Sequence, residues 1–357
     1  MSASEYRDEL IKNAKQITRP GYGILAADES TGTIGKKFDA IGLENTETNR
    51  QRYRQLLFST PDLEKYISGV ILYDETARQN NSDGKNFCDY LTARNILPGI
   101  KVDKGVKPLM GTNDETVTQG MDDLGARCAE YYKMGCRFAK WRGVLKIGNG
   151  LPSNLSIAEN TATLARYASI CQQHGLVPIV EPEILADGDH DIKTSQAVNE
   201  RVWAAQVKAL NDHNVLLEGC LIKPNMVTPG NSHATRSTMK SEEIAARTLT
   251  FLLRTIPPAL PGVCFLSGGQ SELEATSNLN NMNKAEKRPW SLTFSFGRAL
   301  QNTCIKTWNG SDDNLKAAQD ALILRARSNA EANLGKFVID GSQEGANESL
   351  IVENYVY

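Results

Sequence analysis

Leu216-Leu-Glu-Gly-Cys-Leu-Ile-Lys223 is an apolar run that ends in a lysine and is followed by Pro224. Proline cannot continue a central strand, so we expect a strand that stops at Lys223. Burial disfavours the charged form of an amine, and a neutral amine is a nucleophile that can form a Schiff base with a carbonyl compound. Taken alone, the run is explained better by a lysine whose side chain extends from the strand end into solvent than by a reactive buried amine. The rest of the chain reverses that preference.

The run is one of eight short apolar segments that recur at intervals of roughly 30–45 residues, each ending in a charged or hydroxyl residue. The segments are residues 23–28, 69–74, 98–103, 137–142, 177–183, 217–223, 263–267 and 292–298. Helix-like stretches lie between them. Strands that alternate with helices predict right-handed βαβ units and a parallel sheet. Eight units predict a closed (β/α)8 TIM barrel, in which polar residues at the carboxyl ends of the strands form the active site.

Helix start and stop signals support this alternation. Ser156-Ile-Ala-Glu159 matches a capping box and predicts the start of a helix, and Gly175 predicts its end. A second helix is expected to begin at Ser241-Glu-Glu-Ile and must end before Pro257. An extra amphipathic helix is expected around residues 4–18, before the first strand.

The domain organisation follows from the same pattern. Barrels of about 250 residues or more form single domains, so residues 1–334 are expected to form one catalytic barrel domain that includes the N-terminal helix. The segment that follows is rich in Gly, Ser, Asn and Glu. This composition predicts that residues 335–357 form a flexible C-terminal tail.

Composition excludes several classes of protein. The net charge of −2 over 357 residues gives no basic field for nucleic acid or an anionic membrane. No apolar stretch is long enough to span a bilayer, so no membrane insertion is expected. The seven cysteines are scattered without a CxxC motif, which predicts reduced, buried thiols and a cytoplasmic location.

No metal site and no cofactor are expected. The four histidines are His174, His190, His213 and His233, and they form neither an HExxH motif nor a tight cluster. Each falls at an expected helix end or in a loop, where a surface role is expected.

Charged residues are expected to converge at the barrel mouth. Side chains alternate between the two faces of a strand, so the pairs Lys101 and Asp103, Lys140 and Arg142, and Glu181 and Glu183 each share a face. One face of a closed parallel sheet points inward, where these pairs can meet Asp28 and Lys223. A cluster of lysines and carboxylates in a partly dry site separates their pKa values, which suits acid and base catalysis. The alternative is a structural ion-pair network, and the number of strands involved favours catalysis.

Two groups of residues suggest phosphate binding. Ser267, Gly268 and Gly269 follow the seventh segment and precede an expected helix, and Gly297 and Arg298 follow the eighth. Backbone N–H groups at a helix start bind phosphate, and barrels often place that site after strands seven and eight. A second set of hydroxyl groups and cations is expected across the mouth, and its members are Ser30, Thr33, Lys37 and Lys101. Two anion sites beside a reactive amine predict a bisphosphorylated carbonyl substrate.

The chain resembles the class I fructose-bisphosphate aldolases. The resemblance rests on Leu25-Ala-Ala-Asp28-Glu-Ser-Thr-Gly, on Leu221-Ile-Lys-Pro-Asn-Met-Val-Thr-Pro-Gly230, and on residues 99–105, 138–142, 179–185, 265–271 and 294–300. It runs in order from the N-terminal helix to the terminal tyrosine. The family implies reversible cleavage of fructose 1,6-bisphosphate to dihydroxyacetone phosphate and glyceraldehyde 3-phosphate, in glycolysis and gluconeogenesis, without a cofactor.

The resemblance implies a role for each matched residue. Lys223 would form the Schiff base, Glu181 would act as general acid and base, and Asp28 would take the proton of the C4 hydroxyl group. Lys140 and Glu183 would hold charge and orientation around Lys223, and Tyr357 would assist proton transfer at the enamine. One phosphate would bind Ser267, Gly268, Gly297 and Arg298. The other would lie near Ser30, Thr33, Lys37 and Lys101, with Arg142 close by.

Two departures and one alternative function remain. Lys37 stands where familiar animal members carry arginine, so this contact to the phosphate lacks the two parallel hydrogen bonds that a guanidinium group can donate. Tyr22 stands where many members carry a basic residue. The family is typically a homotetramer, and its members are known to bind actin filaments and protein tails, which is the alternative, non-catalytic role. Another Schiff-base sugar-phosphate lyase is disfavoured by the paired anion sites.

Overall fold

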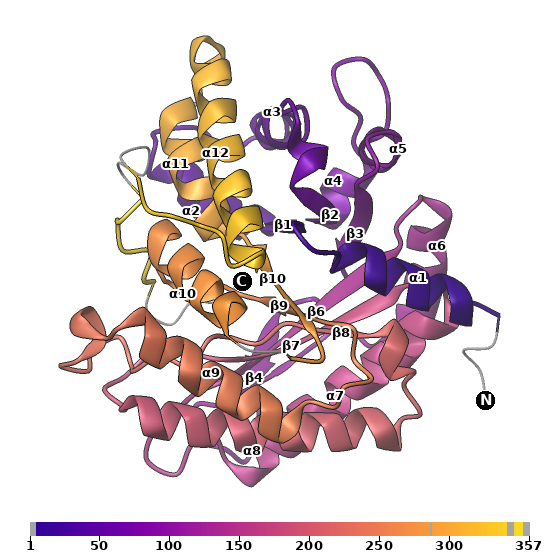
Figure 1. The fold of residues 1–357 in the computed structure, drawn as a ribbon. Helices are drawn as coiled ribbons and strands as arrows, with labels where there is room; N and C mark the ends of the chain where they lie inside the picture. Colours follow the sequence, from indigo (N-terminus) through magenta and orange to yellow (C-terminus); the bar gives the residue numbers. More distant parts are fainter. Residues whose placement is uncertain (1–4, 286–287, 341–345, 353–357) are drawn as a thin grey trace.

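The computed structural model describes residues 5–285, 288–340 and 346–352. Eight parallel strands close into a barrel in the order β1-β10-β9-β8-β7-β6-β3-β2, and helices surround it (Figure 1). The strands are β1 (Gly23–Ala27), β2 (Ile67–Leu72), β3 (Leu97–Lys101), β6 (Phe138–Leu145), β7 (Val177–Ile184), β8 (Leu221–Ile222), β9 (Gly262–Phe265) and β10 (Ser291–Phe296). The predicted (β/α)8 barrel is confirmed, with all eight predicted segments contributing a strand.

The helices alternate with these strands as predicted. They are α1 (Arg7–Ile17), α2 (Thr31–Asp39), α3 (Glu47–Phe58), α4 (Asp74–Arg78), α5 (Phe87–Ala93), α6 (Leu124–Lys133), α7 (Asn154–Gln173), α8 (Ile192–Asp212), α9 (Ser241–Thr255), α10 (Glu272–Lys284), α11 (Arg298–Trp308) and α12 (Leu315–Asn333). Figure 1 shows α7, α8 and α9 along one side of the barrel and α11 and α12 on the opposite side. A small antiparallel hairpin, β4 (Val106–Pro108) and β5 (Thr116–Thr118), leaves the barrel after β3.

The predicted capping box is wrong by three residues. Helix α7 begins at Asn154, and its N-cap is Ser153, whose hydroxyl oxygen accepts a hydrogen bond from the Ser156 N–H at 3.0 Å. Ser156 therefore lies buried in the first turn, and Glu159 is exposed rather than folded back onto the helix start. The predicted stop is confirmed, since Gly175 follows the helix with a φ of +77°, a conformation that glycine adopts without steric cost. Helix α9 also begins and ends where predicted.

The strand that carries Lys223 is shorter than its apolar run. Only Leu221 and Ile222 form β8, while residues 217–219 form a single 3-10 turn. By contrast, β6 and β7 each run for eight residues and pair along their whole length, which places Arg142 beside Glu181 in register. The charged side chains of these two strands therefore lie within the barrel, below its carboxyl-terminal rim as well as at the rim.

Apolar side chains fill the lower part of the barrel. Ile24, Ile71, Phe138, Ile179 and Leu221 belong to one buried cluster inside the sheet. The Phe138 ring packs so close to the backbone of β3 that a Cβ atom at position 99, where the chain has glycine, would overlap it. This packing closes the interior, so a polar site can form only at the carboxyl end of the strands.

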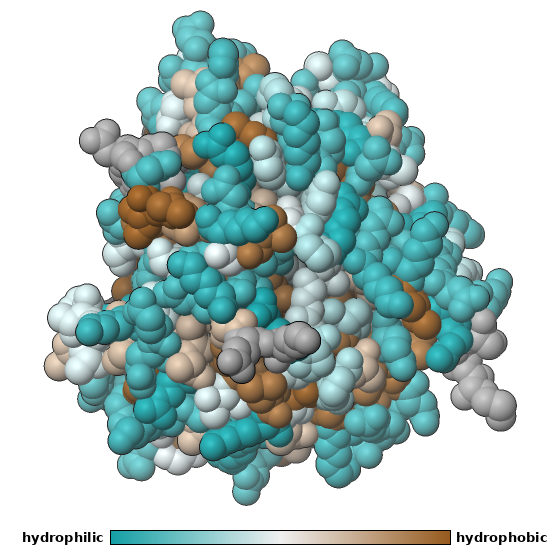
Figure 2. Space-filling view, viewed as in Figure 1, coloured by the Kyte–Doolittle hydropathy of each residue, from teal (hydrophilic) through white to brown (hydrophobic). Residues whose placement is uncertain are grey.

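Described parts of the C-terminal segment lie against the barrel. Phe337 and Ala346 are buried in the main hydrophobic core, while Val338 is 73% exposed. The terminal residue Tyr357 lies outside the described residues. The visible face of the molecule is mainly hydrophilic, with small separate apolar areas (Figure 2).

Other predictions have mixed outcomes. The seven cysteines are free and buried as predicted. The four histidines are each partly exposed. Across the described ranges, no helix is both long and apolar enough to cross a membrane.

Candidate active site

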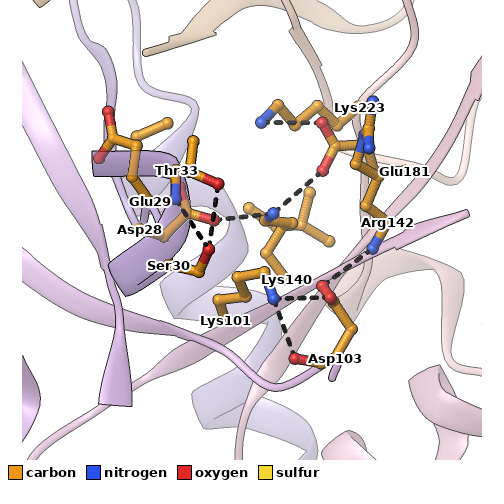
Figure 3. A network of polar contacts seen from close by, with 12 residues as sticks. Asp28, Glu29, Ser30, Thr33, Lys101, Asp103, Lys140, Arg142, Glu181 and Lys223 are labelled. Atoms are coloured by element: carbon orange, nitrogen blue, oxygen red, sulfur yellow. Dashed lines mark hydrogen bonds and ion pairs between the residues drawn. The ribbon is translucent and has the colours of Figure 1, made fainter. Parts of the chain in front are cut away.

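The charged residues predicted to converge do meet at the carboxyl end of the barrel. Asp28 follows β1, Lys140 lies in β6, Glu181 lies in β7 and Lys223 follows β8. Strand alternation turns all four side chains inward, and each is almost wholly buried. Figure 3 shows them as a continuous chain of polar contacts between opposite walls of the barrel.

Glu181 links the two lysines of this chain. Lys223 Nζ lies 3.0 Å from Glu181 Oε1, and Lys140 Nζ lies 3.5 Å from Glu181 Oε2. Lys140 Nζ also lies 2.7 Å from Asp28 Oδ2. A carboxylate that contacts the buried Lys223 amine directly can exchange protons with that amine and with groups bonded to it.

Lys140 is the electrostatic centre of the cluster. Burial opposes its charge, but the carboxylates of Asp28, Glu181 and Asp103 outweigh burial and raise the pKa of Lys140 above its usual value. The ammonium group therefore stays charged throughout the neutral range. A permanent cation at this position offsets the charge of two neighbouring carboxylates that would otherwise repel each other.

A second ion pair adjoins the first cluster. Lys101 Nζ lies 2.7 Å from Asp103 Oδ1 and donates a hydrogen bond to the Asp103 carbonyl oxygen at 3.0 Å. Asp103 Oδ2 accepts a hydrogen bond from the Arg142 backbone N–H at 3.3 Å. Burial alone would raise the pKa of Asp103, but Lys101 and Lys140 reverse this and lower it. Lys101 is therefore held in place by the barrel and not free to swing into solvent.

Arg142 pairs with Glu183 inside the barrel wall. Its Nε atom donates a hydrogen bond to Glu183 Oε2, and both side chains are at most 9% exposed. Burial favours the neutral form of Glu183, yet Arg142, Arg298 and Lys223 together lower its pKa. The pairing places Arg142 in the charge balance around Glu183, whose carboxylate is also influenced by Lys223.

One pocket joins the amine to the predicted phosphate residues. Asp28, Glu181, Glu183 and Lys223 line it together with Ser267, Gly268, Gly297, Arg298 and Lys37. Arg298 is the first residue of α11, and its Nη1 group donates a hydrogen bond to the Leu350 carbonyl oxygen at 2.6 Å. The C-terminal segment therefore reaches the edge of this pocket.

The second predicted phosphate set divides into two places. Ser30 and Lys101 line a separate cavity with Lys104 and Arg127. Lys37 instead lines the Lys223 pocket and pairs with Glu29, while Thr33 exchanges a hydrogen bond with Ser30 at 3.0 Å. Lys37 therefore lies on the side of Arg298 rather than with Lys101.

Sequence reasoning assigned no role to two residues of the pocket. Ser295 lies in β10, is 1% exposed and has a hydroxyl group without a protein partner among the described residues. Strand alternation in the sequence could have indicated that Ser295 lines the pocket, because it puts Ser295 on the same face as Gly297. Glu29 is 5% exposed and pairs with Lys37 and Arg54. Little in the sequence indicated that Glu29 is buried here, because a charged residue just after a strand usually faces solvent.

The fold and the site define an enzyme of the TIM-barrel class that acts on a phosphorylated carbonyl compound. A buried amine in contact with a carboxylate, beside glycine-rich turns at the ends of the last two strands, supplies the groups that such chemistry needs. The sequence model of one protein family, "Fructose-bisphosphate aldolase class-I", matches residues 9–357. The chain belongs to the class I fructose-bisphosphate aldolase family.

Individual relatives agree with this assignment. Fructose-bisphosphate aldolase 5, cytosolic, of Arabidopsis thaliana is 59% identical over 99% of this chain and 98% of its own length. The cytoplasmic isozyme 1 of Pisum sativum is 58% identical over 99% and 98% of the two chains. A solved structure of the Plasmodium falciparum aldolase, in complex with TRAP and a small-molecule inhibitor, superposes with a TM-score of 0.93 at 51% identity, covering 94% of this chain and 97% of that chain.

These comparisons confirm the predicted activity. The chain is a carbon–carbon lyase, a fructose-bisphosphate aldolase of glycolysis. The predicted cytoplasmic location agrees with the names of the two plant relatives.

Proposed function

We propose that the chain cleaves fructose 1,6-bisphosphate through a Schiff base on Lys223, with Glu181 as its general acid and base. The supporting observation is the 3.0 Å contact between Lys223 Nζ and Glu181 Oε1 at the carboxyl end of the barrel. Both side chains are at most 4% exposed. A buried amine with a proton acceptor in direct contact is the arrangement that imine formation requires.

The reaction uses the cluster in sequence. The Lys223 amine attacks the ketone carbon, and Glu181 then protonates the hydroxyl group of the carbinolamine, which leaves as water. Asp28 takes the proton of the C4 hydroxyl group, and the electron pair of the breaking C3–C4 bond moves to the iminium. The aldehyde product departs and an enamine remains. Protonation of the enamine and hydrolysis of the imine release the second product and return the amine.

Lys140 and the pair of Arg142 with Glu183 hold charge during these steps. Lys140 lies between Asp28 and Glu181, so its ammonium group orients both carboxylates toward the substrate. Glu183 carries a negative charge beside the nitrogen on which the iminium forms, and Arg142 fixes its position. Such preorganised charges stabilise a transition state without moving.

The two phosphates are assigned to opposite sides of the mouth. One binds the turn of Ser267 and Gly268 together with Gly297 and Arg298, which share the pocket with Lys223. The other binds Ser30 and Lys101, with Thr33 bonded to Ser30. Lys37 supports the first phosphate in this assignment, because it lines the Lys223 pocket.

Borohydride trapping tests the nucleophile. Reduction in the presence of dihydroxyacetone phosphate should attach the substrate carbon chain to Lys223 and abolish activity, and peptide mapping identifies the modified lysine. Lys223→Met should show no labelling, whereas Lys101→Met, which removes another buried lysine, should still be labelled at Lys223. Labelling at Lys140 in the wild-type protein, or no labelling, contradicts the assignment.

The C-terminal segment is proposed to be a flexible arm, residues 335–357, that delivers Tyr357 to the enamine. The Leu350 carbonyl oxygen contacts Arg298 at the edge of the pocket. Position 357 lies seven residues after position 350, and an extended chain of that length reaches at most about 25 Å. The tyrosine hydroxyl group can therefore approach Lys223 without movement of the barrel.

We also propose a homotetramer and a second role in protein-tail binding, including actin as a partner. The family resemblance supports the tetramer, and Met110, in the loop between β4 and β5 and 81% exposed, offers an apolar contact. The TRAP complex of the Plasmodium falciparum relative supports tail binding. Sedimentation equilibrium tests the tetramer. Competition between substrate and actin filaments or acidic peptides tests the second role, with charge-reversed peptides as the control.

A further inference from the structure

Residues 267–270 form a tight turn at the edge of the active-site pocket. Gly268 and Gly269 have φ values of +57° and +82°, a region that favours glycine. The Gln270 N–H closes the turn by donating to the Ser267 carbonyl oxygen at 3.0 Å. Within the part of the chain that the structure describes, the N–H groups of Ser267, Gly268 and Gly269 have no protein acceptor. Consecutive free N–H groups of this kind suit an anion.

Packing alone does not hold this turn. On one side Gly268 lines the open pocket of Lys223. On the other side Gly268 and Gln270 line a small polar cavity of about 20 Å³, shared with Glu183 and Asn225. Gly269 lies close to Ile351 of the C-terminal segment, whereas Gly268 lies between the two polar spaces, where polar contacts contribute to the shape of the turn.

Two buried amide side chains supply those contacts. Gln270 Nε2 donates to the Ser267 carbonyl oxygen at 2.8 Å, and Asn278 Nδ2 donates to Gln270 Oε1 at 2.6 Å. Gln270 is 3% exposed, and Asn278, in helix α10, is fully buried. The Ser267 carbonyl oxygen can only accept hydrogen bonds, so the NH₂ group of Gln270 must face it. The Gln270 oxygen then faces Asn278, which must present its own NH₂ group.

Asn278 is not explained by packing. Its Oδ1 atom is buried without a partner among the described residues, and an unpaired buried acceptor costs stability. An apolar side chain of the same size would avoid that cost. A residue that lowers stability in this way is often retained for a functional reason.

We propose that Asn278 and Gln270 are positioning residues that hold the turn of residues 267–269 in its anion-binding shape and thereby set the affinity for the substrate phosphate. Asn278 orients the Gln270 amide, and Gln270 fixes the Ser267 carbonyl oxygen, which turns the neighbouring N–H groups toward the pocket. This inference rests on the proposed assignment of one phosphate to that turn.

Four variants separate this role from a purely structural one. Gln270→Met removes both side-chain hydrogen bonds at nearly constant volume. Asn278→Asp keeps the shape of the side chain but presents only acceptors, so the Gln270 amide must reverse and direct its oxygen at the Ser267 carbonyl oxygen. The double variant tests whether the two residues act in series. Arg298→Ala, outside the pair, shows how much phosphate binding occurs at this end of the pocket.

The measurements are the inhibition constant for inorganic phosphate, kcat and KM for fructose 1,6-bisphosphate, and borohydride trapping with dihydroxyacetone, which lacks a phosphate. Both single variants should raise the phosphate inhibition constant and KM roughly tenfold, about the effect of losing one or two hydrogen bonds. Saturated kcat should stay within about twofold, and trapping with dihydroxyacetone should not change. Asn278→Asp should add nothing in the Gln270→Met background.

Three results would overturn the inference. If Arg298→Ala weakens phosphate inhibition but Gln270→Met does not, the phosphate site stands and the amide pair does not position it. If neither change alters phosphate inhibition, the phosphate is not bound at this turn, and the inference fails together with that part of the proposed function. Lower thermal stability with unchanged phosphate inhibition would show that the pair is only structural.

Discussion

Lys140→Met removes the cation that joins two carboxylates at the barrel mouth, and it replaces lysine with an unbranched side chain one heavy atom shorter. Lys140 Nζ lies 2.7 Å from Asp28 Oδ2 and 3.5 Å from Glu181 Oε2, and its side chain is 1% exposed. Coulomb's law with an effective dielectric constant of about 20 gives attractions of about 6 and about 5 kcal/mol. Desolvation of the charges offsets most of this gain. Removal of one partner from a buried pair destabilises a protein by about 3–5 kcal/mol.

We expect Lys140→Met to lower the free energy of unfolding by that amount and kcat/KM by about 10³-fold. Without the lysine, Asp28 and Glu181 lose their common partner, and like charges at short range favour protonation of one of them. A protonated Asp28 cannot accept the proton of the C4 hydroxyl group. A protonated Glu181 cannot accept a proton from Lys223.

Urea denaturation and steady-state cleavage measure the two effects separately. Circular dichroism at the assay temperature checks that the variant is folded when its rate is measured. Lys140→Arg is the matched control, since it keeps the charge, and it should recover most of the lost stability but less of the activity. A Lys140→Met protein with the unfolding free energy and the kcat/KM of the wild type would refute the reasoning.

Four further outcomes are expected. Asp28→Asn should lower cleavage by about 10²–10⁴-fold yet leave trapping at Lys223 intact, and lost trapping in a folded protein would assign Asp28 to an earlier step. Lys37 and Arg54 outweigh burial and lower the pKa of Glu29 from its usual value of 4.5 to about 2. The Glu29 carboxylate therefore contributes about 3 kcal/mol to the free energy of unfolding above pH 4.5, and this contribution is lost as the pH falls toward 2. Between pH 4.5 and 2, the free energy of unfolding of Glu29→Gln should therefore fall less than that of the wild type, measured by acid denaturation. Removal of Tyr357 should slow turnover without weakening Schiff-base trapping, and an unchanged steady-state rate would make the tail a bystander. Activity should survive EDTA, because the four histidines are dispersed in the sequence and the iminium is the electron sink; loss in EDTA that zinc restores would contradict this.

The barrel could be predicted from the sequence because its signal is periodic. Each of the eight apolar segments in the sequence is five to seven residues long and has a polar end, and each lies at a barrel strand. The start of α7 could not be placed from the capping pattern, since Ser153 and Ser156 are both good caps and only the observed hydrogen bond decides between them. Local patterns thus identify an element more reliably than its first residue.

The convergence of Asp28, Lys140, Glu181 and Lys223 was predictable for a similar reason. Strand alternation fixes which side chains point inward, and barrel closure brings the inward side chains together. The pairing inside the cluster was not predictable, because it depends on side-chain conformation as well as on the register between neighbouring strands. Arg142 lies beside Glu181 in register, yet its guanidinium group pairs with Glu183.

Charge balance at the barrel mouth separates chemistry from phosphate affinity. The central buried cluster has as many basic groups as carboxyl groups, namely Lys140, Arg142 and Lys223 against Asp28, Glu181 and Glu183. A cluster without net charge gives little attraction to a doubly phosphorylated substrate. The attraction must therefore come from groups beside the cluster. These are Arg298, Lys37 and the N–H groups of residues 267–269 at one phosphate, and Ser30 and Lys101 at the other. Changes to these groups should alter KM, whereas changes inside the cluster should alter kcat.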